Sequence, residues 1–261
     1  MTVDYLLDNQ AQETVGRFGA LAQLFDGVAF RHFDRLGVDS GWTCWEVGAG
    51  GSSVATWLAR CTQPTGRVLA TDIDVSWMSV ESAAEFEILR HDVSSDVPPV
   101  GPFDLVHARL VLTHVRQRGA ALENMVSTLK PGGWLLVEDF DVLLQTRAIL
   151  DTARDDLVAN RIRAGFAALL AERGVDLEFG RKLPRLLREL GLTDVGADAY
   201  MPVALPAVAA LEAANVHQLR AALVSHAYAT PPEIESHLKA LRRGNLDLAT
   251  PPLVSAWGRR V

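Results

Sequence analysis

The sequence has little cysteine, little lysine and no cluster of basic residues. Cys44 and Cys61 are its only cysteines, which excludes a disulfide framework and a site in which cysteines alone surround a metal. Lysine occurs only at positions 130, 182 and 239, and the formal net charge of the 261 residues is −7. Because binding to nucleic acid requires a basic surface, we expect no nucleic-acid partner.

The sequence also lacks a long apolar run, and its first residues lack the basic and apolar regions of a signal peptide. No run reaches the roughly 18 apolar residues of a membrane-spanning helix. The opening Met-Thr-Val-Asp-Tyr has neither part of a signal peptide. We therefore expect a cytoplasmic protein without membrane contact. Hydrophobic residues make up 49% of the chain, a composition that favours a folded core over disorder.

A glycine-rich stretch, Trp45–Gly51, stands between a hydrophobic run and the helix-like segment 52–59. Gly48 and Gly50 permit backbone angles that a side chain would forbid. A loop of this kind, at the end of a first parallel strand and before a helix, is typical of a nucleotide site. A dinucleotide fingerprint would require a small apolar residue at position 53, where Ser53 stands. The loop therefore does not favour NAD as its ligand.

The acidic residue two positions before the first glycine suggests a different ligand. Glu46, Gly48 and Gly50 form the pattern E-x-G-x-G, which resembles motif I of the class I methyltransferases that use S-adenosylmethionine (SAM). The resemblance implies that Gly48, Ala49 and Gly50 face the amino-acid end of SAM. It also implies that Glu46 helps to hold the positive end of that cofactor.

Two further carboxylates follow predicted strands at the spacing of such a site. Asp72 follows the strand 66–71, roughly 20 residues after the glycines, where these folds place the acid that binds the ribose hydroxyls. Ile73 comes next as a cofactor contact, and Asp74 is either a second carboxylate of the site or the N-cap of the next helix. The resemblance implies that Asp92, after the short strand 86–89, accepts the adenine amino group, while Val93 packs on the ring.

Two later segments strengthen the resemblance. Phe-Asp-Leu-Val, the start of a predicted strand over 103–109, resembles motif IV, and its exit at Ala108 and Arg109 lies near the transferable methyl in that family. Leu-Lys-Pro-Gly-Gly-Trp-Leu-Leu-Val-Glu, residues 129–138, is similar to the family's approach to strand five. We interpret 130–133 as the stop of a helix over 120–129. The Asn/Asp-Pro-Pro-Tyr form of the amino-methylating DNA enzymes is missing, which disfavours a flipped-base substrate.

Ionisable groups near these strand ends are the candidate catalysts. Asp139 follows strand five and could orient the methyl acceptor or stabilise developing charge, or it could simply turn the chain. His114, on a helix predicted over 110–115, is a second candidate base, although such a histidine is more often a packing group. No metal is expected, although the acidic cluster Glu138, Asp139 and Asp141 leaves a magnesium-assisted mechanism open.

The first residues form a predicted arm. Apolar positions recur at helical spacing over 9–36, with a break expected at Asp26-Gly27. The segment resembles the N-terminal arm of many bacterial small-molecule methyltransferases, which implies that Tyr5 and Arg17 contact the cofactor. The alternative is that both side chains only decorate the surface.

Together these features predict an α/β fold with a Rossmann-like seven-stranded sheet in a single domain. The arm is 1–36, the SAM-binding core 37–141, and the helical cap 142–180 and 207–243, with apolar residues such as Phe166, Leu169 and Leu170 available to line a pocket. The chain resembles a class I methyltransferase of the natural-product and ubiquinone-menaquinone type. This implies SAM as cofactor, S-adenosylhomocysteine as product and a small apolar or aromatic acceptor, and it is compatible with a homodimer. The alternative is a SAM-binding protein of the same fold that is regulatory or catalyses a non-methylating reaction.

Overall fold

The computed structural model describes residues 14–78, 85–148, 153–244 and 246–261. The chain divides into two compact units. The first contains residues 1–25, 141–177 and 201–252, and the second contains residues 26–140, 178–200 and 253–261. The expectation of a single domain stays a prediction, and each unit is described by itself. None of the described helices is long and apolar enough to cross a membrane.

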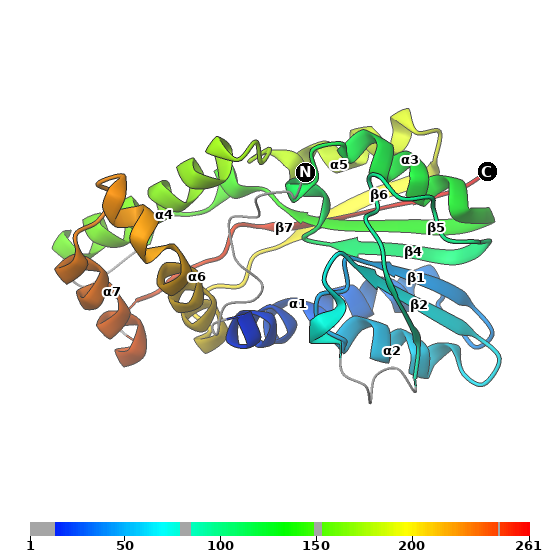
Figure 1. The fold of residues 1–261 in the computed structure, drawn as a ribbon, viewed down its shortest axis with the longest axis horizontal. Coiled ribbons are helices and arrows are strands. Elements are labelled where there is room, and N and C mark those ends of the chain that lie inside the picture. The colour runs from blue at the N-terminus through cyan, green and yellow to red at the C-terminus, as the bar shows by residue number, and fades with distance from the viewer. Residues whose placement is uncertain (1–13, 79–84, 149–152, 245) are drawn as a thin grey trace. The chain divides into compact units, whose positions relative to one another are not determined.

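The second unit is built on a seven-stranded sheet with the order β3-β2-β1-β4-β5-β7-β6 (Figure 1). The first five strands are parallel, and β7 runs antiparallel to both of its neighbours, β5 and β6. This confirms the predicted α/β fold and the number of strands. The strands are β1 (Thr43–Val47), β2 (Arg67–Asp72), β3 (Glu87–Arg90), β4 (Phe103–Arg109), β5 (Leu129–Phe140), β6 (Thr193–Tyr200) and β7 (Leu253–Arg259).

Helices cover both faces of this sheet (Figure 1). On one face, α3 (Arg118–Thr128) and α5 (Phe179–Glu189) bury residues such as Met125 and Leu183 against β1, β4 and β5. On the other face, α2 (Ser53–Thr62) and the later part of α1 (Thr14–Leu36) bury Leu58 and Phe33. Because both faces are covered, the central strands are apolar on both sides, and a polar side chain within them needs a specific partner.

Several predicted boundaries differ from the structure. The break predicted at Asp26-Gly27 is wrong, since α1 runs through both residues. A single glycine costs a helix only about 1 kcal/mol, which packing can offset. The segment predicted as a helix over 110–115 is a 3-10 turn, η3 (Leu112–His114), preceded by Leu110 at a φ of 58°. The residues 130–133, interpreted as a turn, belong to β5. A short 3-10 turn, η1 (Val75–Trp77), follows β2.

The first unit is helical. It contains η4 (Val142–Leu144), α4 (Ala153–Glu172), α6 (Pro206–Ser225) and α7 (Pro231–Arg243). Leu169 and Leu170 are only 1% and 4% exposed, so they belong to the core of this unit rather than to an open pocket. Arg163 on α4 lies 3.3 Å from Glu212 on α6 and donates to the backbone oxygen of Ala249 at 3.0 Å. This buried arginine therefore joins three segments of the unit.

Candidate functional site

The glycine-rich loop lies at the carboxyl end of β1, where the order of the sheet reverses. From β1 the chain proceeds outward to β2 and β3, and it then returns to β4 on the other side of β1. In open α/β sheets, ligands bind in the crevice outside the strand ends at such a point. The helix α2 begins at Ser53, directly after the loop, so its first N–H groups face the same end of the sheet.

Gly48 is required for the shape of this loop. Its φ of 63° lies in the left-handed region that favours glycine. A Cβ at this position would lie 2.3 Å from Cγ2 of Val111, which follows β4. The loop backbone is therefore in close contact with the segment after β4.

Asp72 connects the end of β2 to the glycine loop. Its Oδ2 accepts a hydrogen bond from the N–H of Gly50 at 2.8 Å, and its Oδ1 accepts one from the N–H of Asp74 at 2.9 Å. Burial raises the pKa of Asp72, although these two backbone donors act against the rise. Ile73, the next residue, is 53% exposed, which leaves an apolar side chain open at this strand end.

Asp74 is the N-cap of the short helical turn η1, which was the alternative to a role in the site. Its side chain accepts a hydrogen bond from the N–H of Ser76 at 3.0 Å and caps η1. Asp72 is therefore the better placed of the two carboxylates for a ligand at the strand end.

Asp92 and Val93 follow β3 as expected from the sequence. Asp92 accepts hydrogen bonds from the N–H and the hydroxyl of Ser94 at 2.9 Å and 2.7 Å. Burial alone would raise the pKa of Asp92, but the hydrogen bonds from Ser94 and Ser95, together with the nearby His91, lower that pKa. Val93 is buried, and its backbone oxygen accepts a hydrogen bond from Asn124 at 3.0 Å. Both residues are held firmly at the end of a strand next to β2.

Glu46 is paired with a histidine that sequence reasoning did not single out. Glu46 on β1 and His107 on β4 lie directly opposite each other, and His107 Nδ1 is 2.6 Å from Glu46 Oε2. The other ring nitrogen of His107 lies 3.3 Å from Oε2 of Glu138 on β5. Glu138 also accepts a hydrogen bond from the hydroxyl of Ser255 at 2.6 Å. These side chains are almost completely buried.

Arg109 ends β4 and lies directly opposite Glu138. Its Nη2 is 2.7 Å from Oδ1 of Asp26 on α1. Its Nη1 is buried and has no hydrogen-bond partner within the part of the chain that the structure describes. An arginine with one buried donor group still available is suited to an anionic ligand group.

Asp139 points to the opposite face of β5 from Glu138, because successive side chains of a strand alternate. Its Oδ2 accepts a hydrogen bond from the N–H of Thr113 at 2.9 Å, and its Oδ1 accepts one from the N–H of Phe140 at 3.0 Å. Burial raises the pKa of Asp139 to about 7, against the effect of these donors. The cluster Glu138, Asp139 and Asp141 does not converge, since the first two point to opposite faces.

The other candidates are less well placed by the structure. His114 is half-buried at the end of η3, next to the segment that Asp139 holds. Arg17 belongs to the first unit, where its side chain is buried and its guanidinium lies 5.5 Å from the ring centre of Phe18. Tyr5 lies outside the described residues. The cofactor roles expected for Arg17 and Tyr5 stay predictions.

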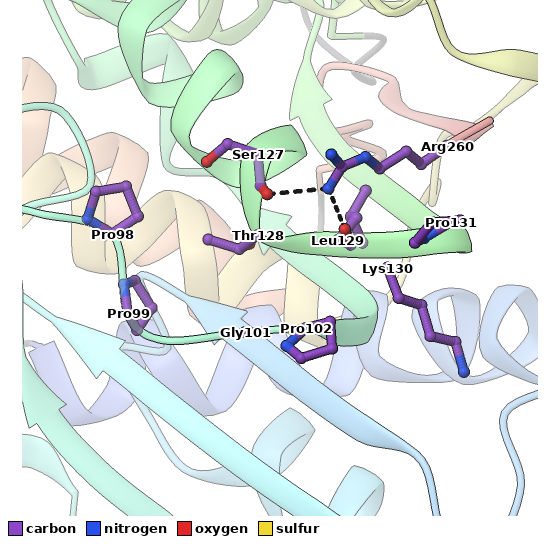
Figure 2. Close-up of a pocket in the computed structure, with 10 residues that line it drawn as sticks. All are labelled: Pro98, Pro99, Gly101, Pro102, Ser127, Thr128, Leu129, Lys130, Pro131 and Arg260. Atoms are coloured by element: carbon purple, nitrogen blue, oxygen red, sulfur yellow. Dashed lines mark hydrogen bonds between the residues drawn. The ribbon is translucent and has the colours of Figure 1, made fainter.

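A surface pocket of about 470 Å³ lies at the amino ends of β4 and β5, at the other end of the strands from the glycine loop (Figure 2). Pro98 and Pro99 line it on one side, and the side chain of Arg260 extends along the other (Figure 2). The guanidinium of Arg260 donates to the backbone oxygens of Ser127 and Leu129. Because the pocket is at the amino ends of the strands, it is separate from the glycine loop.

Comparison with known proteins agrees with the geometry of the strand ends. The family described as a methyltransferase domain matches residues 45–135, which include the glycine loop, Asp72, Asp92 and β4. Residues 45–135 are thus the part of this chain that matches a methyltransferase domain. This confirms the resemblance drawn from the motifs.

Two relatives show how far the methyltransferase similarity extends. The chain is 32% identical over 146 residues to the methyltransferase Str3 of Strobilurus tenacellus, with 54% of this chain and 50% of that protein covered. It is 29% identical over 204 residues to the methyltransferase GfsG of Streptomyces halstedii, with 72% and 68% covered. The chain thus spans about half the length of the first of these relatives.

A solved structure supports the fold of this methyltransferase domain. It is the phosphoethanolamine N-methyltransferase 2 of Haemonchus contortus in complex with phosphomonomethylethanolamine and S-adenosylhomocysteine. The TM-score is 0.61 at 13% identity, with 99% of this chain and 60% of that chain covered. At this identity the similarity concerns the fold.

Proposed function

We propose that the protein transfers a methyl group from SAM to a small apolar or aromatic metabolite and releases S-adenosylhomocysteine. The observation that carries the proposal is that three features lie together at the carboxyl ends of β1 and β2. These are the glycine-rich loop at Gly48, the carboxylate of Asp72 that accepts a hydrogen bond from that loop, and the carboxylate of Glu46 near the end of β1. A class I fold with these groups at its switch point is suited to SAM.

The described residues fit the parts of that cofactor. Gly48, Ala49 and Gly50 would accommodate its amino-acid end, since they follow β1 at the switch point of the sheet. Glu46 would accept a hydrogen bond from the ammonium, and the available Nη1 of Arg109 would donate to the carboxylate. Asp72 would bind the ribose. Ile73, Asp92 and Val93 would surround the adenine.

SAM supplies a methyl group on a positively charged sulfur, so the difficult chemistry belongs to the cofactor. The protein must exclude water and hold the acceptor in line with the methyl, and positioning of this kind lowers barriers by about 7–11 kcal/mol in the best cases. We propose that Asp139 acts at this step through position, since it fixes the backbone of Thr113 after β4. His114, next along the chain, is the proposed proton acceptor where the acceptor molecule loses a proton.

The first unit contains a group of exposed apolar side chains. Leu143, Leu144, Val203 and Leu205 are each between 44% and 55% exposed. Two contacts to one residue place their segments side by side: Gln145 donates to the backbone oxygen of Ala249, and Val203 forms a β-bridge with Ala249. A group of exposed apolar residues around one point favours an apolar ligand.

Labelled SAM and a panel of small phenols, quinones and amines test the proposal. Formation of S-adenosylhomocysteine with a methylated product is expected. Binding of SAM without turnover of any acceptor would favour the alternative, a regulatory or non-methylating SAM-binding protein. Binding of NAD instead of SAM would overturn the proposal.

The proposal includes a cytoplasmic location, a small-molecule partner and no nucleic-acid partner, and it is compatible with a homodimer. The net charge of −7 supports the view on nucleic acid. Tight binding of DNA or RNA that weakens steeply as salt rises would contradict it. Cell fractionation tests the location, and light scattering tests the oligomeric state.

A further inference from the structure

A row of polar side chains crosses five strands near the carboxyl ends of β1, β4 and β5. Register places Glu46 of β1 opposite His107 of β4, and Glu138 of β5 opposite Ser255 of β7, which in turn lies opposite Asp198 of β6. The row lies on the face that α1 and α2 cover, because Phe33 of α1 contacts the His107 ring edge-on at 5.0 Å. A polar row inside a sheet covered on both faces is costly unless each member is paired.

His107 is the central member of this row, and each of its ring nitrogens faces a carboxylate. The distances are 2.6 Å from Nδ1 to Glu46 and 3.3 Å from Nε2 to Glu138. A neutral imidazole has a single N–H and could donate to only one of them, whereas the imidazolium donates to both. Burial alone would lower the pKa of His107, but the charge of Glu46 and the hydrogen bonds to Glu138 and Glu46 raise it to about 9.

Glu138 is fixed from several sides. Ser255 donates to its Oε1, and His32 Nδ1 on α1 lies 3.3 Å from the same oxygen. The other ring nitrogen of His32 is 3.0 Å from Asp198, and Arg109 adds a positive charge beside Glu138. Burial alone would raise the pKa of Glu138, but the hydrogen bonds from His107 and His32 lower it well below its usual range. Glu138 is thus an ionised and immobile partner for His107.

Glu46 differs from Glu138 in one respect. Its Oε2 is engaged by His107, whereas its Oε1 has no hydrogen-bond partner in the described ranges, although the residue is only 3% exposed. We propose that His107 is a positioning residue of the cofactor site: as the imidazolium held by Glu138, it fixes one oxygen of Glu46 and leaves the other for the ammonium of the bound ligand. This inference rests on the proposed function, in which Glu46 binds that ammonium.

The physical reason is geometric. His107 holds Oε2 of Glu46 at 2.6 Å and is itself attached to Glu138, so the directions in which Oε1 can point are limited. In metal sites, the side chains that orient the metal ligands change metal affinity or activity by roughly 10- to 100-fold, and His107 would act on Glu46 in the same indirect way.

Calorimetry with two ligands tests the proposal. S-adenosylhomocysteine carries the ammonium, and 5′-methylthioadenosine lacks the entire amino-acid end. We expect His107→Gln to weaken S-adenosylhomocysteine about tenfold, as expected for a lost hydrogen bond to a charged group, and to leave methylthioadenosine unchanged. The double variant Glu46→Gln/His107→Gln should bind no more weakly than Glu46→Gln alone. His237→Gln, which alters another buried histidine 3.4 Å from a glutamate, is the control and should affect neither ligand.

The outcomes separate this inference from the proposed function. If Glu46→Gln leaves S-adenosylhomocysteine binding unchanged, the role of Glu46 itself is wrong. If Glu46→Gln weakens it and His107→Gln does not, or if His107→Gln weakens both ligands equally, His107 is not a positioning residue. Nitrogen NMR of the histidine side chains in the wild-type protein is independent of any variant. Two protonated ring nitrogens on His107 at neutral pH are expected, and a single one would overturn the proposal.

Discussion

The carboxylate of Asp72 holds the backbone of Gly50 with a hydrogen bond of 2.8 Å, across 22 positions of the sequence. The two residues follow neighbouring strands, β2 and β1. One oxygen of Asp72 is thus directed at the glycine loop and the other at the N–H of Asp74. A carboxylate fixed in this way can accept ligand hydroxyls without first having to be ordered.

Asp72→Ala should weaken SAM binding by roughly 1.5–3 kcal/mol, the range for hydrogen bonds to charged groups. Asp74→Ala is the matched control, because that side chain caps η1 and should not change the affinity. Calorimetry on both folded variants gives the comparison. Equal SAM affinity in wild type and Asp72→Ala would remove the ribose assignment.

Gly48→Ala should destabilise the protein by about 2–4 kcal/mol, from the left-handed backbone angle together with the overlap with Val111. Gly51→Ala should have little effect, because no atom lies within 4 Å of a Cβ there. The free energy of unfolding is measured in urea. In a Val111→Ala background the cost of Gly48→Ala should shrink, because the overlapping methyl groups are gone. An undiminished cost would show that the close contact does not matter.

His107 should make stability depend on pH in the alkaline range. Its pKa is raised from 6.5 to about 9 in the folded state, so its contribution is complete below pH 6.5 and is lost as the pH rises through 9. The linked change in the free energy of unfolding is on the order of 3 kcal/mol. Urea unfolding at several pH values should show a steeper fall in wild type than in His107→Gln, where only the smaller effect of His32 remains. Parallel curves would contradict the raised pKa.

Asp139 should act in a lower pH window. Its pKa is raised from 3.8 to about 7, so its contribution to stability is complete below pH 3.8 and is lost as the pH rises through 7. Asp139→Asn should flatten the pH dependence of unfolding in this window, at the expense of one backbone hydrogen bond worth about 1 kcal/mol.

The kinetics of the same variant test the proposed role of Asp139. If it only positions the segment after β4, Asp139→Asn should lower kcat by a modest factor and leave SAM affinity intact. An unchanged kcat and KM would mean that Asp139 is purely structural.

The sequence was sufficient where the information is local. The strand Phe103–Arg109 was predicted to the residue, because its Phe-Asp-Leu-Val start resembles motif IV. The places of Glu46, Asp72 and Asp92 at strand ends followed from their spacing after predicted strands. The start of β5 was missed because Pro131, Gly132 and Gly133 usually mark turns, whereas here they belong to the first part of an inner strand.

The polar row could not be predicted, because it depends on how distant segments meet. His32 and Asp198 are 166 positions apart, and their contact requires both the strand order and the packing of α1 on the sheet. One signal was available: His107 occupies the same strand face as Leu105, two residues earlier, where an apolar residue is the norm. A polar residue at such a position predicts a buried partner, but it does not say which one.

The position of β7 has a consequence for how the protein is made. This last strand is inserted between β5 and β6, and β6 has no other neighbour in the sheet. On the ribosome, β6 therefore emerges long before the segment that attaches it, and the open edge of β5 persists until residues 253–259 are synthesised. A nascent chain stalled before Leu253 exposes an unpaired strand edge, which is the kind of surface that chaperones shield and that otherwise recruits other chains into aggregates.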